Sequence, residues 1–446
     1  MMRNAFVVLG ALLIGCTSTD LGEADPIDDD RTDRSPSSER DATESKTHEA
    51  PSALNEPTAP GRGTVRGVVR LASGDPVPGA SVRLDTVVVT SDAGGRFELT
   101  NVAPGPQTLT ATWGDEPCVA TTEASVLVHA GTNDADLRLG GDDAIVRKTM
   151  VINFDPIIEA HGNQRLHQVK KWNDPKELNQ KYVDALAQCT NGAVVYKVVE
   201  WNDADRFPIK ADGFTYTDDA YLAGKFHAPD TVRYSPIVKD YDVIAKVNSG
   251  AVDEVIMWGG PYFGYWESIM VGPTPYFVNS DGYLRADAKR NFVIMGMNYE
   301  RGVAEALHSY GHRFESIMTK VYGRWDSKAA KPNAWELFAA RDSDRRGSSG
   351  CGSVHFPPNG AIDYDYANEA TVTSRCDDYL SWPKLTGAKA PVSFTKSWKT
   401  ASGVAELDYL KYWFAHMPHA AGRNADGKQN DWWKYAADFN AYAESR

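Results

Sequence analysis

The chain has 446 residues, which is enough for more than one ordinary domain. Its formal net charge is −13, and its lysines and arginines are not clustered. A nucleic-acid-binding protein needs a basic face for the phosphate backbone, so this composition argues against a nucleic-acid partner.

The first residues are typical of an export signal. Residues 1–3 supply positive charge, and residues 5–12 form an apolar run too short to span a bilayer as a helix. The run is followed by the letters LIGC, whose cysteine is Cys16. This tetrapeptide resembles the lipobox of bacterial lipoproteins, which implies cleavage after residue 15 and a lipid on Cys16. We therefore expect an exported protein anchored to a membrane, with Thr17 favouring the outer membrane or cell surface.

Residues 16–63 are predicted to be a disordered tether. They contain mostly Ser, Thr, Asp, Glu and Pro and almost no large apolar residue. Such a segment buries too little apolar surface to offset the entropy lost on ordering. The folded domains are therefore expected to begin near residue 64.

Four cysteines remain after Cys16, namely Cys118, Cys189, Cys351 and Cys376. An even number of cysteines in an oxidising compartment favours disulfides over metal thiolates. Four cysteines allow three pairings, and the sequence does not choose among them. We favour a bond between Cys351 and Cys376, because both flank one loop-rich stretch.

Residues 64–140 predict a small antiparallel β-sandwich. Short β-branched runs are separated by Gly, Pro and Asp about every eight to twelve residues. The succession of turns is more specific, with Pro78-Gly79-Ala80, then Asp92 before Phe97, then Pro104-Gly105. It resembles the carboxypeptidase regulatory-like domain, a prealbumin-like fold. The resemblance implies a non-catalytic module of an exported protein.

Residues 146–446 predict an α/β domain with a mainly parallel sheet. Apolar runs of strand length alternate here with amphipathic stretches of helix length. The expected strands are 149–154, 193–200, 252–258 and 291–297, and the expected helices are 175–188, near 236–247 and 301–322. Beyond residue 325 the sequence turns into aromatic-rich loops and short helices. The fold class is therefore multi-domain, a small β-sandwich followed by an α/β domain with an aromatic-rich C-terminal region.

The helix expected at 301–322 carries four polar side chains on one face. At about 100° per residue, Glu305, His308, His312 and Glu315 fall within an arc of about 80°. Two histidines one turn apart can chelate one ion, whereas the two glutamates stand about 15 Å apart and cannot both bind it. The pattern predicts a metal site on His308 and His312. The alternative is a pair of histidines that only hydrogen-bond to neighbouring carboxylates.

This spacing resembles the His-x-x-x-His core of a zincin helix, which implies zinc as the ion and peptide as the nominal substrate. The zincin pattern has its general-base Glu directly after the first His, where this chain has Ser309. A base must then come from elsewhere, and the candidates are Glu305, Glu267 and Glu300. Catalytic zinc also needs a third protein ligand. We predict His355, with Asp363 or Asp365 as substitutes.

A second group of polar and aromatic residues follows two of the expected strands. In open α/β sheets, ligands bind beyond the carboxyl ends of the strands. The predicted substrate-binding residues there are Trp258, Tyr262, Trp266 and Asn298. Glutamates beside aromatic rings are also typical of sugar recognition and of acids with a raised pKa. For Glu300, the alternative is an ion pair with an arginine at the start of the long helix.

Together these features predict a lipid-anchored hydrolase of an extracellular polymer, dependent on zinc or another divalent metal. Two alternatives stay open. The first is a metal-free glycoside hydrolase that uses Glu267 with Glu300 or Glu305 as its pair of carboxylates. The second is a non-enzymatic surface lipoprotein that binds carbohydrate through its aromatic residues. A helical pair further on, His416 and His419, is more typical of packing than of metal binding.

Overall fold

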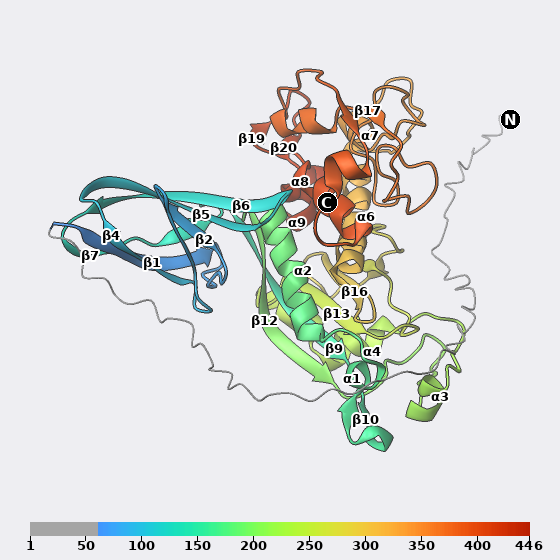
Figure 1. The fold of residues 1–446 in the computed structure, drawn as a ribbon. Helices are drawn as coiled ribbons and strands as arrows, with labels where there is room; N and C mark the ends of the chain where they lie inside the picture. Colours follow the sequence, from blue (N-terminus) through green and yellow to red (C-terminus); the bar gives the residue numbers. More distant parts are fainter. Residues whose placement is uncertain (1–60) are drawn as a thin grey trace, which may run out of the picture. The chain divides into compact units, whose positions relative to one another are not determined.

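The computed structural model describes residues 61–446 (Figure 1). The predicted signal peptide, Cys16 and the tether up to residue 60 lie outside the described residues, so lipid anchoring and export stay predictions. Within residues 61–446, the structure contains no helix that is long and apolar enough to cross a membrane.

The first part of the described chain is a pair of sheets around a shared apolar core. One sheet has the order β3-β2-β5-β6 and is antiparallel throughout. In the other, β1 pairs with β4 antiparallel but with β7 and β8 in parallel, which differs from the predicted antiparallel sandwich. The strands are β1 Gly63–Leu71, β2 Ser81–Leu84, β3 Val87–Thr90, β4 Arg96–Val102, β5 Gly105–Asp115, β6 Cys118–Val128, β7 Gly131–Asp134 and β8 Leu137–Leu139.

The second part is built on a six-stranded sheet with the order β12-β9-β13-β16-β14-β15. Neighbouring strands from β12 to β16 are parallel, as predicted, but β14 runs antiparallel to β16, so the sheet is mixed. The strands are β9 Ile145–Phe154, β12 Val194–Ala204, β13 Glu254–Gly259, β14 Ser268–Gly272, β15 Tyr283–Leu284 and β16 Phe292–Asn298. β13, β14 and most of β16 are buried on both faces, as the continuous apolar runs of a covered sheet require.

Separate apolar clusters cover the two faces of this sheet. One face packs against α2 (Pro175–Cys189), α6 (Val303–Tyr322) and the C-terminal segments. The other packs against α4 (Tyr234–Asp240) and α5 (Val243–Ser249). The start of α2 is fixed locally, since the Asp174 carboxylate accepts two backbone N–H groups and proline follows at the first helical position.

The single helix predicted near 236–247 is in fact two helices. Asp242 separates α4 from α5 and has a left-handed backbone with φ 51°. Asp tolerates this conformation better than most residues, but a continuous helix does not. The apolar periodicity continues through the break, which explains why the sequence pattern suggested one helix.

The C-terminal region consists of short elements and long connections, as predicted. Among the described residues, six tryptophans are completely or almost completely buried, five of them in this region. Figure 1 shows these segments beside α6. The elements are α7 Ala334–Phe338, β17 Val372–Ser374, β18 Ala390–Val392, α8 Ala405–Ala415, β19 His419–Arg423, β20 Gln429–Asp431 and α9 Trp433–Ala437.

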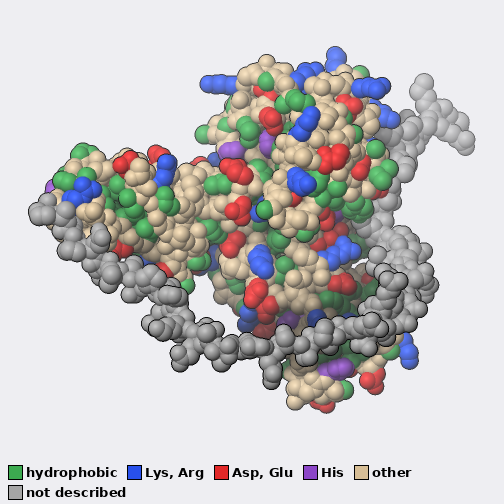
Figure 2. Space-filling view, in the orientation of Figure 1, with side chains coloured by type: hydrophobic (Ala, Val, Ile, Leu, Met, Phe, Trp, Pro, Cys, Tyr) green, Lys and Arg blue, Asp and Glu red, His purple; other side chains and the backbone are tan. Residues whose placement is uncertain are grey.

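Two disulfides are present among the described residues. The predicted bond between Cys351 and Cys376 is confirmed, and it closes a loop with a sequence separation of 25. The second joins Cys118, at the start of β6, to Cys189, the last residue of α2. The face of the molecule in Figure 2 carries acidic and basic side chains interspersed among neutral ones.

Candidate metal centre

The helix α6 presents His308 and His312 on consecutive turns. It follows β16 after a short connection and begins after Gly302. Because residues four apart lie on the same face of a helix, the two imidazole rings meet. Their Nε2 atoms are 3.0 Å apart. The helix thus supplies two potential ligand atoms directed at one point.

His355 reaches the same point from a tight turn that spans residues 353–356. Ser353 and Phe356 close the turn through reciprocal backbone hydrogen bonds of 2.8 and 3.1 Å. The Nε2 of His355 lies 3.0 Å from the Nε2 of His312. One ligand atom from each of the three histidines lies within 4.8 Å of the other two.

A glycine in α6 makes this approach possible. Gly311 lies between the two helical histidines, and a Cβ built on it would be only 2.5 Å from Cγ2 of Val354. Glycine in a helix interior costs about 1 kcal/mol relative to alanine, so its presence needs a reason. The reason here is close packing, because the turn that carries His355 presses against the helix at Gly311.

Each histidine has a carboxylate on the opposite side of its ring. The Nδ1 of His308 is 2.9 Å from Oε1 of Glu406, and the Nδ1 of His312 is 3.0 Å from Oε2 of Glu315. The Nδ1 of His355 is 3.6 Å from Oδ1 of Asp363, an ion-pair distance rather than a hydrogen bond. A carboxylate that faces Nδ1 favours the tautomer with the proton on Nδ1. The Nε2 lone pairs are then left to face one another.

Glu315 also holds the turn against the helix. Its second oxygen, Oε1, accepts a hydrogen bond of 2.8 Å from the backbone N–H of Val354. One buried carboxylate therefore orients His312 and fixes the turn that presents His355. Tyr366 adds a second support, since its hydroxyl donates to the carbonyl of Val354 over 3.0 Å.

The donor set fits a small divalent ion. A tetrahedral ion with zinc–nitrogen bonds of about 2.0–2.1 Å holds its ligands about 3.3–3.4 Å apart. Two of the Nε2–Nε2 separations are 3.0 Å, close to this value, and the third ligand pair lies within 4.8 Å. Facing lone pairs repel each other unless a proton or a metal cation lies between them, and imidazole nitrogen suits zinc and the neighbouring transition metals. The residues that are present thus suit the ion that the sequence pattern implied.

Of the predicted general bases, Glu267 is the one whose carboxylate is within ion-pair distance of a clustered histidine. Its Oε2 lies 3.9 Å from the Nε2 of His312. Glu267 directly precedes β14, and its carbonyl accepts a 3.0 Å hydrogen bond from Gly296 of β16. Asn279 donates a short hydrogen bond to the carboxylate. The start of β14 and the hydrogen bond from Asn279 therefore hold the Glu267 side chain in place.

Glu305 and Glu300 are placed differently. Glu305 is one turn before His308 and forms a 2.7 Å ion pair with Arg301. Burial raises the pKa of Glu305, while the charge of Arg301 lowers it and that of Glu267 raises it. Glu300 is exposed, and its charge raises the pKa values of Tyr221 and Arg301. Within residues 61–446, no ion pair or hydrogen bond links its carboxylate to the three histidines.

The pKa of His312 is raised to about 9. Burial lowers it, but the hydrogen bond that His312 donates to Glu315 and the negative charges of Glu315, Glu267 and Glu305 outweigh burial. The acidic surroundings of this ring therefore favour a positive charge at the cluster, and a bound cation would supply that charge in place of the proton.

The predicted substrate-binding residues do not form one group. Trp258 is completely buried in the core and donates to Asn179 over 3.1 Å, so the prediction that it contacts substrate is wrong. Trp258 lies within β13, whose residues are all buried, and its side chain packs in the apolar cluster that includes α2 and α6. Tyr262 and Trp266 are partly exposed, and Tyr262 stacks on Phe226. The side-chain oxygen of Asn298 accepts a backbone hydrogen bond at the end of β16.

Several residues of the centre were missed by sequence reasoning. Glu406 lies 98 positions from its partner His308, and no local spacing links them. Glu315 was placed on the right helix face but was considered only as a possible ligand. Gly311 was a usable signal, because glycine inside a long helix often marks a close approach. The other predicted pair, His416 and His419, lies outside the cluster, and His416 pairs with Asp377 at 3.2 Å.

Comparison with known proteins identifies only the first domain. A crystal structure described as a "putative carbohydrate binding protein" from Pseudomonas aeruginosa is similar, with 17% identity, over 18% of this chain and 88% of that chain, and a TM-score of 0.13. A chaperone-substrate complex shows 10% identity over 50% of this chain and 27% of that chain, with a TM-score of 0.21. Among curated proteins, none matches this chain. Residues 64–140 match the family model of the carboxypeptidase regulatory-like domain, as the turn motifs predicted.

Proposed function

We propose that His308, His312 and His355 hold a divalent metal ion, most suitably zinc, and that residues 146–446 form a metal-dependent hydrolase. One observation carries the proposal. Three Nε2 atoms converge while the three Nδ1 atoms face three different carboxylates. Metal-binding histidines typically have such carboxylate partners, which fix the ring and its tautomer.

The arrangement supports hydrolysis rather than a structural metal role. The donor set has three nitrogens, and catalytic zinc sites commonly have three protein ligands and a place for water, whereas structural sites are closed by four. Zinc at such a site polarises a carbonyl or phosphoryl oxygen and lowers the pKa of water. In this proposal the partly exposed Glu267, 3.9 Å from His312, would act as the proton acceptor beside the metal-binding nitrogens.

Glu305 has a supporting role in this proposal. Its ion pair with Arg301 engages one carboxylate oxygen, and it lies on the same helix face as His308. A partly buried carboxylate there adds negative charge near the histidines and so favours a bound cation. Glu300 has no assigned role.

The substrate class rests on the sequence. An exported chain with a lipid on Cys16 would meet extracellular polymers, and the zincin-like spacing makes peptide the nominal class. Tyr364 supports a polymeric substrate, because its half-exposed ring lies 4.6 Å from the ring of His355. An aromatic ring beside the ligand atoms offers a flat surface for a substrate group.

A second candidate is the metal-free glycoside hydrolase. It is favoured by the pKa of Glu305, which burial and the charge of Glu267 both raise. A raised pKa keeps a carboxyl group protonated, as a general acid must be. In this case the histidines would only orient neighbouring carboxylates.

Hydrolysis assays on the full chain separate these two functions. We expect cleavage of a fluorescent casein or an aryl ester that stops with a chelator, returns with zinc and is absent in His308→Ala/His312→Ala. A matched control is His129→Ala/His161→Ala, which removes two exposed histidines outside the cluster. Activity on polysaccharide that survives both the chelator and the cluster variant would favour the glycoside hydrolase.

A further inference from the structure

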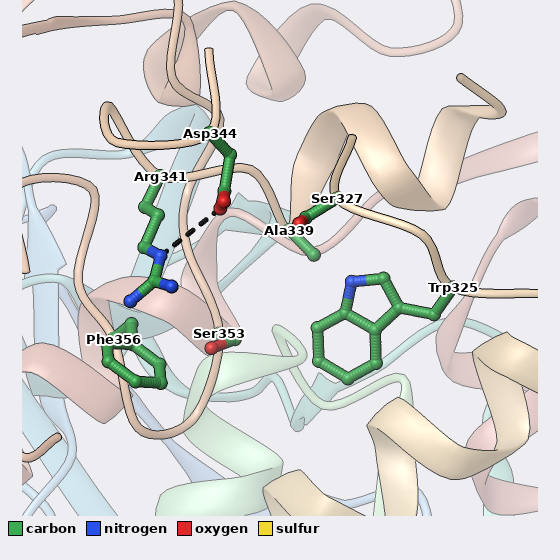
Figure 3. A pocket seen from close by; sticks show the side chains of 7 residues that line it. All are labelled: Trp325, Ser327, Ala339, Arg341, Asp344, Ser353 and Phe356. Carbon is green, nitrogen blue, oxygen red and sulfur yellow. Dashed lines mark hydrogen bonds and ion pairs between the residues drawn. The ribbon is translucent and has the colours of Figure 1, made fainter. Parts of the chain in front are cut away.

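A cavity of about 270 Å³ lies next to the turn that carries His355. Figure 3 shows Trp325 on one side of it and Arg341 above the Phe356 ring on the other. Its walls come from loops after α6 and α7 and from the turn itself. The residues that line it are Trp325, Ser327, Ala339, Arg341, Asp344, Ser353 and Phe356.

The cavity and the metal centre share one structural element. Ser353 and Phe356 line the cavity and are the two ends of the tight turn, and His355 lies between them. The ends of such a turn are within about 7 Å of each other. The carbonyl of Phe356 also accepts a 3.1 Å hydrogen bond from the buried Tyr409, which holds this end of the turn. The cavity therefore adjoins the turn that carries one of the three clustered histidines.

Arg341 and Asp344 are the charged groups of the cavity, and the Arg341 side chain is held in place on two sides. Its Nε donates to Asp344 over 3.2 Å, and its guanidinium lies 4.0 Å from the centre of the Phe356 ring. Within residues 61–446, its two terminal nitrogens have no hydrogen-bond partner. Figure 3 shows them above the Phe356 ring. A guanidinium fixed in this way presents two parallel N–H donors, which match a carboxylate.

We propose that this cavity binds a flat apolar group that bears a carboxylate. The carboxylate would lie against the terminal nitrogens of Arg341, and the apolar body would pack on the indole of Trp325. The volume suits a single residue of a polymer rather than a larger ligand, because pockets for drug-sized molecules begin at about 300 Å³. As a substrate subsite, the cavity rests on the hydrolase proposed above and gives it a preference for such a residue.

The test uses phenylacetate as the probe and benzyl alcohol as the uncharged comparison. Binding is measured by saturation-transfer NMR on the full chain with His308→Ala/His312→Ala, because a metal ion could itself bind the carboxylate. We expect millimolar binding of phenylacetate and at least about tenfold weaker binding of benzyl alcohol, since a charge-assisted hydrogen bond is lost. This result does not depend on whether the histidines bind metal.

Two variants locate the binding. Arg341→Met/Asp344→Asn removes the guanidinium without leaving an unpaired carboxylate, and should weaken phenylacetate binding about tenfold or more. Trp325→Ala should weaken both probes. Arg346→Met, an exposed arginine nearby, is the matched control and should change nothing. Equal binding of the two probes, no binding at millimolar concentration, or unchanged binding in the double variant would overturn the proposal. Phenylacetate that binds here but does not compete with a hydrolysed substrate would overturn only its role as a subsite.

Discussion

The Nδ1 of His308 and the Oε1 of Glu406 are 2.9 Å apart although the residues are separated by 98 positions in the chain. Glu406 lies in the first turn of α8, and α8 packs on α6. The contact between two helices therefore sets the orientation of a histidine ring, and with it the direction of Nε2.

Replacing Glu406 with glutamine should weaken metal binding. The change keeps the size of the side chain but removes the negative charge that orients and polarises His308. We expect zinc affinity to fall about 10- to 100-fold, as measured by competition with a chromophoric chelator. Glu369→Gln is the control, because Glu369 is exposed and its carboxylate accepts a hydrogen bond from Thr395. Unchanged affinity in Glu406→Gln would show that this carboxylate does not support a metal ligand.

Replacing Gly311 with alanine tests whether this glycine is needed for the close approach of the turn that carries His355. Alanine is favoured in a helix by about 1 kcal/mol, but its Cβ would be 2.5 Å from Val354, whose branched side chain adjusts little. We expect the turn with His355 to move away and zinc affinity to fall. The double variant Gly311→Ala/Val354→Ala should recover part of the loss, because it removes the clash. Full affinity in Gly311→Ala alone would contradict the close-packing argument.

Replacing Glu267 with glutamine distinguishes a proton acceptor from a ligand. If Glu267 accepts the proton, zinc content should stay unchanged while the rate of hydrolysis falls about 10²- to 10⁴-fold. Both quantities are measured on the same preparation. Glu300→Gln, at an exposed position, should affect neither. Loss of zinc in Glu267→Gln would make this residue a fourth ligand and remove it as the base.

Asp184 gives a prediction about stability that is independent of the metal centre. Burial raises its pKa to about 6, and a hydrogen bond from Gln180 lowers it less. The folded state thus holds this proton more tightly than the unfolded state, so the stability from protonation is present at low pH and is lost as pH rises through about 6.

Asp184→Asn should therefore raise the free energy of unfolding at pH 7 but not at pH 4. The gain should not exceed about 3 kcal/mol, the value of two pKa units. Urea unfolding at the two pH values measures it, with the exposed Asp115→Asn as control. An equal effect at both pH values would argue against a shifted carboxyl group.

The sequence predicted those features of the fold that depend on local periodicity. The alternation of apolar runs located β9, β13, β16, α2 and α6 to within a few residues, and the turn residues located the first domain. The antiparallel β14 was missed, because Ser268–Gly272 is a short apolar run whose direction no local pattern fixes. Parallel pairing of β7 and β8 with β1 is likewise set by tertiary packing.

The same distinction applies to the site. His308 and His312 lie on one helix, so helical spacing predicted that they meet. His355 was predicted only from its residue type, and the structure brings it to them through a turn that packs at Gly311. Glu406 was not predicted, since only the packing of α8 on α6 places it there. Trp258 was assigned to the surface because the sequence does not show how deep a strand end lies.

The metal content of the purified full chain, measured by elemental mass spectrometry, tests the central claim most directly. We expect close to one zinc, or one equivalent of another divalent transition metal, per chain. We expect loss of that metal in His308→Ala/His312→Ala and retention in His129→Ala/His161→Ala. A well-folded wild-type chain that contains no metal and takes up none when zinc is supplied would contradict it.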